Sequence, residues 1–561
     1  MFITLILWAI YFFVFFLYGL AGFWLFGFKT RLKESKLEIS HILLFGLVVV
    51  TAFGLILNFI IPMRLIAFSI MVAGAIILFI YFFRQGQLRL FIKKPIWNKK
   101  NWLKISISIL VFIFVLYNTV QLSKNPDSGQ YHTQAIRWTE SYPVVPGLGN
   151  LHDRLAYNSS WFVLLALFSF SFFPGISFHV MPGFVFLLFS IGMLSQIQPR
   201  RFHITDIFPI LFLPLLLFTN ASELSSPGTD LPVILAVSYC VFLFSFKSLL
   251  GETEPWASIL MAGLLLWTIT IKLSAIPVLL LIFVLLVESK NRVRFIKSVL
   301  GFSFLLIFPW MIRNLILSGY PLFPSPMLNV FNFDWKIPLT QVQAEQISIR
   351  GWARFPRMDP NEILSLPLLS WVKIWLSNLT LNRKILILSS LVIPIIHFGT
   401  ILINRKYREI SKQNGSRFTI VFLFAGFVFW FFSAPNIRFG FAFILPQIAI
   451  GISAFLIWFM DLLEEKWKQV LLNTVSLGSF VLVSVLFIRS LDFYKIQTTI
   501  LFPTAYPTLP TEPCHLGNAT IFCASSYNEC WYSPFPCIPS AIENVYLRGD
   551  NYAQGFYYKN D

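Results

Sequence analysis

The chain alternates long apolar runs with short polar segments from its first residues to about residue 490. The runs are about 15 to 25 residues long, the length a helix needs to cross a hydrocarbon layer roughly 30 Å thick. Counting them predicts about fourteen transmembrane helices, and therefore an all-α polytopic membrane protein. The first run, Ile3 to Phe28, has no basic leader and no small-residue cleavage site, so we expect a retained span rather than a signal peptide.

Two places depart from this pattern. The run Trp161 to Phe173 is too short to span comfortably and is broken by Pro174-Gly175, so we expect a re-entrant or interfacial segment. The runs Ser258–Ile271 and Leu273–Leu286 are each short and are separated only by Lys272. We expect them to be two spans that meet at the outer face.

Lys and Arg collect in alternate loops, as they do on the cytoplasmic side of membrane proteins. The basic loops are Lys29–Lys36, Arg84–Lys104, Arg200–Arg201, Lys290–Lys297, Arg405–Arg417 and the weaker Lys466–Lys468. This parity predicts that the N-terminus, the loop after the fourth span and the C-terminal tail all lie outside. Hydrophobic residues make up 57% of the 561 positions, so the net charge of +18 reflects topology and anionic lipid rather than a nucleic-acid partner.

The outer ends of the spans collect ionisable groups, whereas the span interiors carry almost none. Asp127, just after the fourth span, is the candidate catalytic residue. The candidate substrate-binding residues are His132, Arg137, His152, Arg154, Asp230, Lys272, Arg313 and Arg438. Transporters and pumps usually place charges near the bilayer midplane. A cluster at the membrane surface instead favours chemistry on a lipid-tethered substrate.

Each candidate also has a purely structural interpretation. Asp127 could cap a helix, since Gln130 three residues later completes a capping-box pattern. Asp230 could be a turn or cap residue, and the histidines could be interfacial polar groups. Arg313 and Arg438 could be snorkelling anchors at the ends of spans. A cap and a catalytic carboxylate are compatible, because a side chain at a helix start projects beyond the helix end.

Several motifs resemble those of the GT-C superfamily of polytopic glycosyltransferases. They are the stretch from Asp127-Ser128-Gly129-Gln130-Tyr131-His132 to Asn158-Ser159-Ser160, the run from Trp310-Met311-Ile312-Arg313-Asn314 to Pro324, and Ser433 to Gly440. The first stretch looks most like a bacterial subgroup of these membrane proteins, and the resemblance covers roughly residues 100 to 460.

The resemblance implies a GT-C-like helical bundle with interfacial helices on its outer face. It implies that Asp127 acts on the acceptor and that the sugar donor is a polyprenyl phosphate. Some members carry two acidic residues spaced by one at this place, whereas this chain has only Asp127. A divalent metal therefore stays an open alternative, and no cofactor is assigned.

A glycosyl transfer needs a base for the acceptor hydroxyl, cations for the departing phosphate and a groove for the polyprenyl tail. Asp127 is the candidate base. The candidate phosphate partners are Lys272, Arg313 and Arg438. The arginines are favoured because their planar fork matches phosphate oxygens. The candidates for orienting the sugars are His132, Arg137, His152 and Arg154. A single displacement predicts inversion at the anomeric carbon.

The expected transmembrane domain covers residues 1–488, with large outer loops at 123–160 and 313–384. The second loop carries the aromatic and basic stretch Arg350–Arg354 and could be a lid or a structured interfacial loop. Residues 489–561 form a small exported tail with the cysteines Cys514, Cys523, Cys530 and Cys537. Four cysteines in an oxidising compartment predict two disulfides, with the pairing open. Zinc is a weaker alternative, because the spacing lacks tight cysteine pairs.

These observations predict an inverting glycosyltransferase, moving a hexosyl or pentosyl group on the outer face of a bacterial cytoplasmic membrane. The expected partners are a polyprenyl-phosphate sugar donor, membrane lipids, and a glycan, lipid or protein acceptor of the cell envelope. Three alternatives stay open: a polymerase or ligase of the O-antigen type, a transporter or flippase, and a non-catalytic scaffold for lipid-linked glycans. A polymerase would place its Arg and His cluster in a late loop, and a transporter would carry charges inside its spans.

Overall fold

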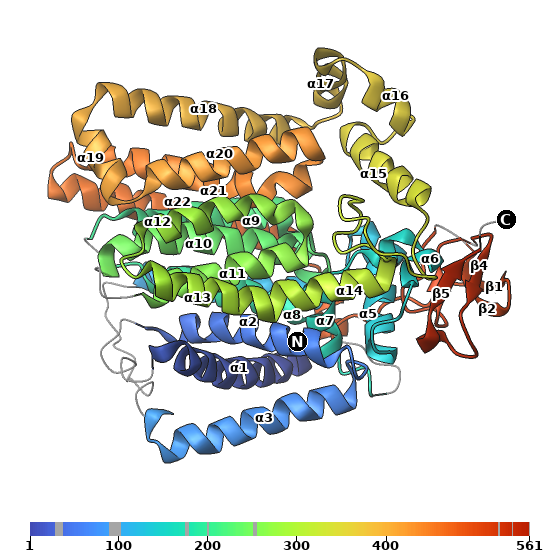
Figure 1. Cartoon of the computed structure of the whole chain (residues 1–561). Coiled ribbons are helices and arrows are strands. Elements are labelled where there is room, and N and C mark those ends of the chain that lie inside the picture. The colour runs from blue at the N-terminus through green and yellow to red at the C-terminus, as the bar shows by residue number, and fades with distance from the viewer. Residues whose placement is uncertain are drawn as a thin grey trace.

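The computed structural model describes residues 1–28, 37–88, 102–173, 179–198, 201–250, 255–525, 528–540 and 542–559. The predicted basic loop Lys29–Lys36, most of Arg84–Lys104, Arg200 and the Pro174-Gly175 break lie outside the described residues. Figure 1 shows long helices lying side by side along one direction, with the strands gathered at one end of this bundle.

The first half of the chain is helical. It begins with α1 (Phe2–Phe23), η1 (Trp24–Phe28), α2 (Ile39–Leu57), α3 (Leu65–Arg84) and α4 (Trp102–Thr119). The loop after α4 holds η4 (Ser128–His132), α5 (Thr133–Ser141), α6 (Leu148–Leu151), η5 (Asp153–Ala156) and α7 (Ser160–Leu167). Next come α8 (Met181–Ser195), α9 (Ile204–Asn220), η6 (Ala221–Ser225), α10 (Asp230–Leu250), α11 (Trp256–Ile271), η7 (Leu273–Val278) and α12 (Leu279–Glu288).

The second half adds further helices and a small β region. The helices are α13 (Arg292–Phe302), η8 (Ser303–Ile307), α14 (Phe308–Ser318), α15 (Leu339–Arg354), α16 (Pro360–Ser365), α17 (Leu368–Ser377), α18 (Leu381–Ile403), α19 (Arg405–Gln413), α20 (Ser416–Ser433), α21 (Ile437–Met460) and α22 (Glu465–Ser490). The tail contains α23 (Phe493–Thr499), β1 (Thr511–Leu516), β2 (Ala519–Ala524), β3 (Cys537–Ile538), β4 (Val545–Leu547), η9 (Tyr552–Gln554) and β5 (Phe556–Tyr558).

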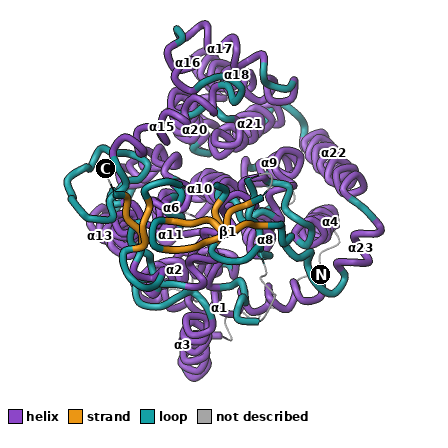
Figure 2. The backbone as a smooth tube through the Cα atoms, turned by 90° about the vertical axis from the view of Figure 1, so that its right-hand side faces the viewer, coloured by secondary structure: helices purple, strands orange, loops and turns teal. Residues whose placement is uncertain are grey.

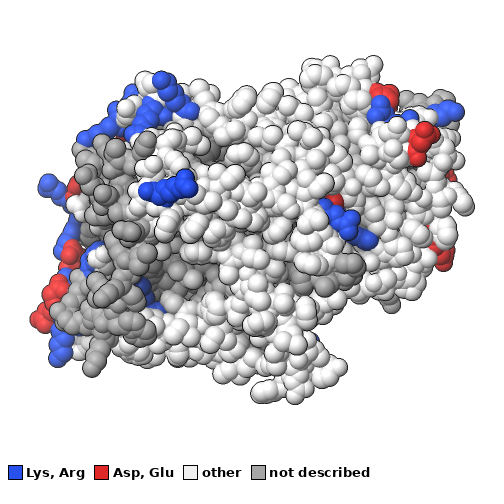
Figure 3. Space-filling view, turned by 90° about the horizontal axis from the view of Figure 1, so that it is seen from below, with Lys and Arg blue, Asp and Glu red and all other residues white. Residues whose placement is uncertain are grey.

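Ten helices within the described residues are long and apolar enough to cross a membrane. They comprise Phe2–Gly27, Ile39–Leu57, Leu65–Arg84, Ile204–Ser225, Asp230–Leu249, Arg292–Ser318, Leu381–Ile403, Ser416–Ser433, Ile437–Met460 and Glu465–Ser490. Seen from below, the molecule carries a broad uncharged belt, and most of the visible Lys and Arg gather at its two ends (Figure 3). An uncharged belt around helices as apolar as these suits lipid contact. The fold is that of a helical, multi-pass membrane protein.

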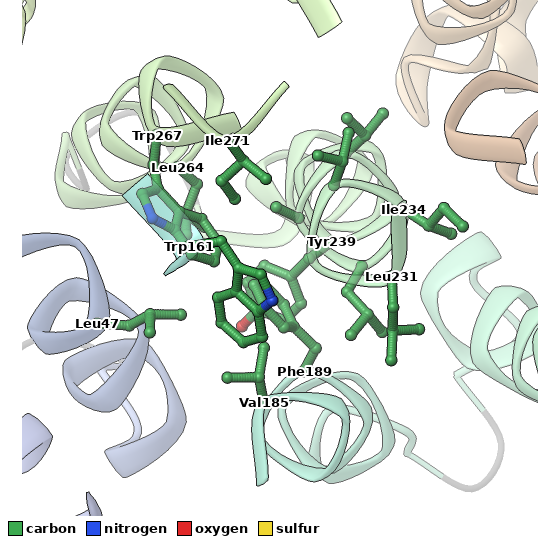
Figure 4. Packing of buried hydrophobic residues seen from close by; sticks show 14 of the residues in the cluster. Leu47, Trp161, Val185, Phe189, Leu231, Ile234, Tyr239, Leu264, Trp267 and Ile271 are labelled. Atoms are coloured by element: carbon green, nitrogen blue, oxygen red, sulfur yellow. The ribbon is translucent and has the colours of Figure 1, made fainter. Parts of the chain in front are cut away.

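The centre of the bundle is packed with aromatic and branched side chains. Trp161 of α7 is fully buried and lies near Leu47 of α2, Val185 of α8 and Tyr239 of α10 (Figure 4). It meets Trp267 of α11 edge to face, with the ring centroids 6.4 Å apart. The short run after residue 160 is therefore an internal helix rather than an interfacial one.

Hydrogen bonds join the N-terminus to the segment that follows α22. The N-terminal amine donates to the carbonyl of Thr499, and the amide of Phe2 donates to the carbonyl of Ile500 at 2.8 Å. These contacts put the first helix beside the start of the tail.

The helix break at Lys272, between α11 and η7, is found where the sequence predicts it.

The tail is a β structure that the hydrophobic pattern did not predict. Strands β1 and β2 form an antiparallel hairpin, β3 pairs with β2 in parallel, and β4 pairs with β5. Viewed along the helices, these strands lie across the ends of the bundle (Figure 2). Two disulfides join Cys514 to Cys523 and Cys530 to Cys537, which confirms the predicted number and leaves no thiolates for zinc.

Candidate active site

A cavity of about 500 Å³ opens at the tail end of the bundle, where α10 and α21 begin and α11 and α20 end. The loop after α4 and one face of α15 form its other walls. Six of the nine residues singled out in the sequence line this cavity: Asp127, His132, Arg154, Asp230, Lys272 and Arg438. The fold therefore brings together groups that lie more than 300 positions apart in the chain.

Asp127 lies at the start of the helical turn that faces the cavity. Asn125 caps this turn, because its side-chain oxygen accepts the backbone N–H of Asp127 at 3.1 Å and Pro126 follows it directly. The Asp127 carboxylate makes no capping bond. One of its oxygens accepts from Arg438 at 3.0 Å, and the other lies 3.7 Å from Arg154. The interpretation of Asp127 as the helix cap is wrong, and its side chain is directed to the cavity.

The turn after Asp127 is a π-helix over Ser128–His132, a wider turn that often occurs at functional sites. It directs His132 into the cavity, where the ring is almost completely buried. Burial lowers the pKa of His132 to about 4, against the opposing effect of Asp127. The imidazole is therefore neutral at pH 7, and its Nδ1 has no hydrogen-bond partner among the described residues.

A second ion pair forms the floor beside Asp127. The ammonium of Lys272, at the break after α11, donates to Asp230 at the first position of α10. The same ammonium lies 3.7 Å from the ring centroid of Phe439. Lys272 and Arg438 thus place two cations, each with a carboxylate partner, on one side of the cavity.

The face of α15 supplies the opposite wall through Glu345, Gln346, Arg350 and Trp352. Tyr157 donates a hydrogen bond to the Glu345 carboxylate. Burial raises the pKa of Glu345 to about 7, while the bond from Tyr157 acts in the opposite direction. Near neutral pH this carboxyl group can therefore either donate or accept a hydrogen bond.

Tyr157 and Glu345 were not among the residues predicted from the sequence: Tyr157 lies within the stretch from Asp127 to Ser160 but was not singled out there, and Glu345 stands in no motif. Asn125 and Glu223 were also missed: the Asn125 amide donates to the Glu223 carboxylate at 3.2 Å, behind Asp127. A signal for Asn125 exists, because an Asn-Pro pair is typical of a helix start.

Three of the predicted residues do not line the cavity. Arg313 is 6% exposed and donates to the side chains of Asn158, at 2.9 Å, Asn58 and Thr139. It is neither a phosphate partner nor a snorkelling anchor, because neutral oxygens enclose its guanidinium.

Arg137 and His152 also bind elsewhere in the protein. Arg137 donates to the carbonyl of Ser533 at 2.6 Å and lies 4.5 Å from the ring centroid of Tyr532, so the tail covers it. The Nδ1 of His152 accepts the backbone N–H of Arg154 at 3.3 Å and caps η5. Neither side chain reaches the cavity, so the predicted role in binding sugars does not fit either of them.

The residues present do not fit a divalent metal ion. Within the described ranges, no three His, Cys, Asp or Glu side chains gather closely enough to hold one. The two aspartates at the cavity floor each already face a cation. The chemistry open to this site is therefore proton transfer at a carboxylate beside cations that can hold an anion.

Comparison with known proteins supplies a family for the chain. No curated protein and no solved structure matches it. The match to a family covers residues 1–445, which include every cavity-lining residue named above. The chain belongs to the family described as a domain of unknown function (DUF8201).

Proposed function

We propose that the protein is an inverting glycosyltransferase of the GT-C kind that takes its sugar from a polyprenyl-phosphate donor. The observation that carries the proposal is the Asp127 carboxylate, which lines a cavity beside the cations Arg438, Arg154 and Lys272. A base next to an anion-binding pair is the arrangement that transfer from a lipid phosphate needs.

In the proposed reaction, the acceptor hydroxyl attacks the anomeric carbon while its proton passes to Asp127. The bond from that carbon to the phosphate oxygen breaks on the opposite side, and the lipid phosphate leaves with the electron pair. Arg438 and Lys272 stabilise the leaving phosphate, and Arg438 can do so with two parallel hydrogen bonds. Neutral His132 lines the cavity, and its ring can hydrogen-bond a substrate hydroxyl.

The two walls of the cavity suit the two substrates. The donor phosphate belongs on the side of Lys272 and Arg438. Phe429 lines the cavity and is 40% exposed on α20, so the apolar wall continues toward the surface where an isoprenoid would lie. The acceptor sugar belongs under α15, where Glu345 offers hydrogen bonds and Trp352 offers a flat ring.

The membrane arrangement follows from the same proposal. Counting four of the five shorter apolar helices as spans, and leaving out the ten-residue helix Leu368–Ser377, gives fourteen crossings; the four are Lys104–Thr119, Met181–Ser195, Trp256–Ile271 and Leu273–Glu288. The cavity and both termini then lie outside a bacterial cytoplasmic membrane, as the basic loops predict. The two disulfides of the tail support this orientation, because disulfides persist in oxidising compartments.

The test is transfer of a labelled sugar from polyprenyl-phosphate donors by the purified full-length protein, comparing wild type with Asp127→Asn. Because Asn125 caps the turn, the substitution leaves the helix start intact, and it removes the base together with the negative charge that faces Arg438 and Arg154. We expect the rate to fall about 10²- to 10⁴-fold. Asp359→Asn is the matched control: Asp359 caps α16 at the protein surface, and asparagine caps equally well.

Two outcomes would contradict the proposal. Near-normal transfer by folded Asp127→Asn protein would show that Asp127 is not the base. Absence of transfer by the wild type with every polyprenyl-phosphate sugar offered would rule out the proposed transferase activity and favour a scaffold that binds lipid-linked glycans.

A further inference from the structure

The turn that carries Asp127 and His132 has the cavity on one side and the tail on the other. We propose that the tail segment Cys530–Cys537, closed by its disulfide, is a positioning element that holds this turn in place for the reaction. The proposal rests on the proposed function for its effect on turnover, but its structural part can be measured without any substrate.

The contact begins at Gly129, in the middle of the π-helical turn. The Gly129 carbonyl accepts the backbone N–H groups of both Cys530, at 2.9 Å, and Trp531, at 3.1 Å. A Cβ atom built on Gly129 would lie 2.4 Å from the indole nitrogen of Trp531. Only glycine lets the tail approach the turn this closely.

The next helix, α5, continues the contact. The Gln134 side chain is bonded at both ends to the tail backbone: its amide donates to the carbonyl of Trp531 at 2.9 Å, and its oxygen accepts the N–H of Cys537 at 3.3 Å. Gln134 is buried, so each lost bond would leave a polar group unsatisfied. The two residues that Gln134 binds lie near the two ends of the segment closed by the Cys530–Cys537 disulfide.

Aromatic packing extends the same interface. The ring of Phe535 packs edge to face against Trp138 of α5, with the centroids 5.0 Å apart. The Arg137 guanidinium lies 5.0 Å from the Phe535 centroid and donates to Ser533. This explains why Arg137 points away from the cavity: it belongs to the tail contact.

The two disulfides differ in what they hold. The Cys530–Cys537 bridge closes the segment that supplies all these contacts. The Cys514–Cys523 bridge instead joins β1 to β2 within the hairpin. Their sequence separations are 7 and 9 residues, so opening either one should cost a similar amount of loop-closure entropy. The second bridge is therefore a matched control for the first.

The experiment compares Cys530→Ser/Cys537→Ser with Cys514→Ser/Cys523→Ser in the full-length protein. Hydrogen exchange of the amides of residues 127–133 and thermal unfolding in detergent are measured on both, followed by kcat and KM for sugar transfer. For the Cys530/Cys537 variant we expect faster exchange of the turn and a kcat about 10- to 100-fold lower, as a misplacement of about 1 Å can cause. KM for the donor should stay close to wild type, because Lys272 follows α11 and Arg438 lies in the first turn of α21, so the turn does not carry the two phosphate-binding cations. For the control, Cys514→Ser/Cys523→Ser, we expect an unfolding temperature similar to that of the Cys530/Cys537 variant. Its hydrogen exchange at residues 127–133 and its kcat should stay near wild type.

Gln134→Ala is a second variant that leaves both disulfides intact, and it should shift exchange and kcat in the same direction. Gln134→Glu keeps the acceptor for Cys537 and should recover part of the loss. Equal effects of the two disulfide variants on exchange of the turn would overturn the proposal, as would unchanged exchange in both Cys530→Ser/Cys537→Ser and Gln134→Ala. If the wild type transfers no sugar, the exchange measurement still decides the positioning role, so failure of the proposed function is told apart from failure of this inference.

Discussion

Two arginines that the sequence predicts at the outer ends of spans have opposite surroundings. The Arg438 side chain is 26% exposed, faces the cavity and is bonded to the Asp127 carboxylate at 3.0 Å. Arg313 is 6% exposed, and neutral oxygens of Asn58, Thr139 and Asn158 hold its guanidinium. The same kind of side chain is thus a candidate ligand-binding group in one place and a structural cross-link in the other.

The difference shows what makes an arginine available for chemistry. Arg313 ties α14 to the end of α2, to α5 and to the loop before α7, and no carboxylate within the described part of the chain pairs with it. A buried charge of this kind is tolerated only when hydrogen bonds replace its water. Arg438 keeps open space on one side, so a phosphate can reach it.

The largest effect on stability is expected for Arg313→Ala. Removing the guanidinium leaves three buried acceptors without donors, and each such loss costs about 1–3 kcal/mol. We expect a marked drop in the unfolding temperature in detergent. Arg357→Ala, at an exposed position between α15 and α16, is the control and should change the temperature little. A stable Arg313→Ala protein would mean that the network is open to water in solution.

Arg438→Gln should show the reverse behaviour. We expect its transfer rate to fall about 10²- to 10³-fold, the usual cost of losing a preorganised charge-stabilising donor. Its unfolding temperature should stay near wild type, because the side chain is partly solvated. Arg438→Lys should recover only part of the rate, since lysine restores the charge but not the planar fork. If Arg438→Gln destabilised the protein as strongly as Arg313→Ala, the two arginines would have the same role.

The sequence predicts most of the charged residues that line the cavity, but it does not distinguish the cavity-lining Arg438 from the enclosed Arg313. The lengths of the apolar runs fix where spans end, which is why Asp127, Asp230, Lys272 and Arg438 were all expected at one face and now line one cavity. Whether an arginine is enclosed depends on neighbours such as Asn58, which lies 255 positions from Arg313. Hydrophobic periodicity carries no information about such contacts.

The disulfide pairing of the tail and its contact with the rest of the protein could not be predicted from the sequence for a similar reason. Cysteine number and compartment predicted two disulfides, but the pairing depends on how the strands align. The β1–β2 register brings Cys514 opposite Ile521 and Cys523 opposite Glu512. The contact of the tail with Gly129 joins positions some 400 residues apart, and only a folded chain shows it.

The smallest expected effect concerns His132, whose ring lines the cavity but is buried as deeply as Arg313. Its pKa falls from about 6.5 in the unfolded chain to about 4 in the folded protein. Burial is the main cause; Asp127 and Asp230 act against it, and Arg438 and Lys272 act with it. Between these two pH values the unfolded chain binds a proton that the folded protein does not. The contribution of His132 to stability should therefore be constant above about pH 6.5 and fall as the pH drops toward 4.

His132→Gln removes this one titration and keeps a neutral polar side chain. Other histidines are present in both proteins, so the difference between the two stability curves isolates His132. We expect the wild type to lose up to about 1.4 kcal/mol per pH unit more than the variant in this window. Thermal unfolding in detergent from pH 7 to pH 4 measures it. Parallel curves would mean that water reaches the His132 ring, and the cavity would then differ from the Arg313 network in hydration as well as in its charged partners.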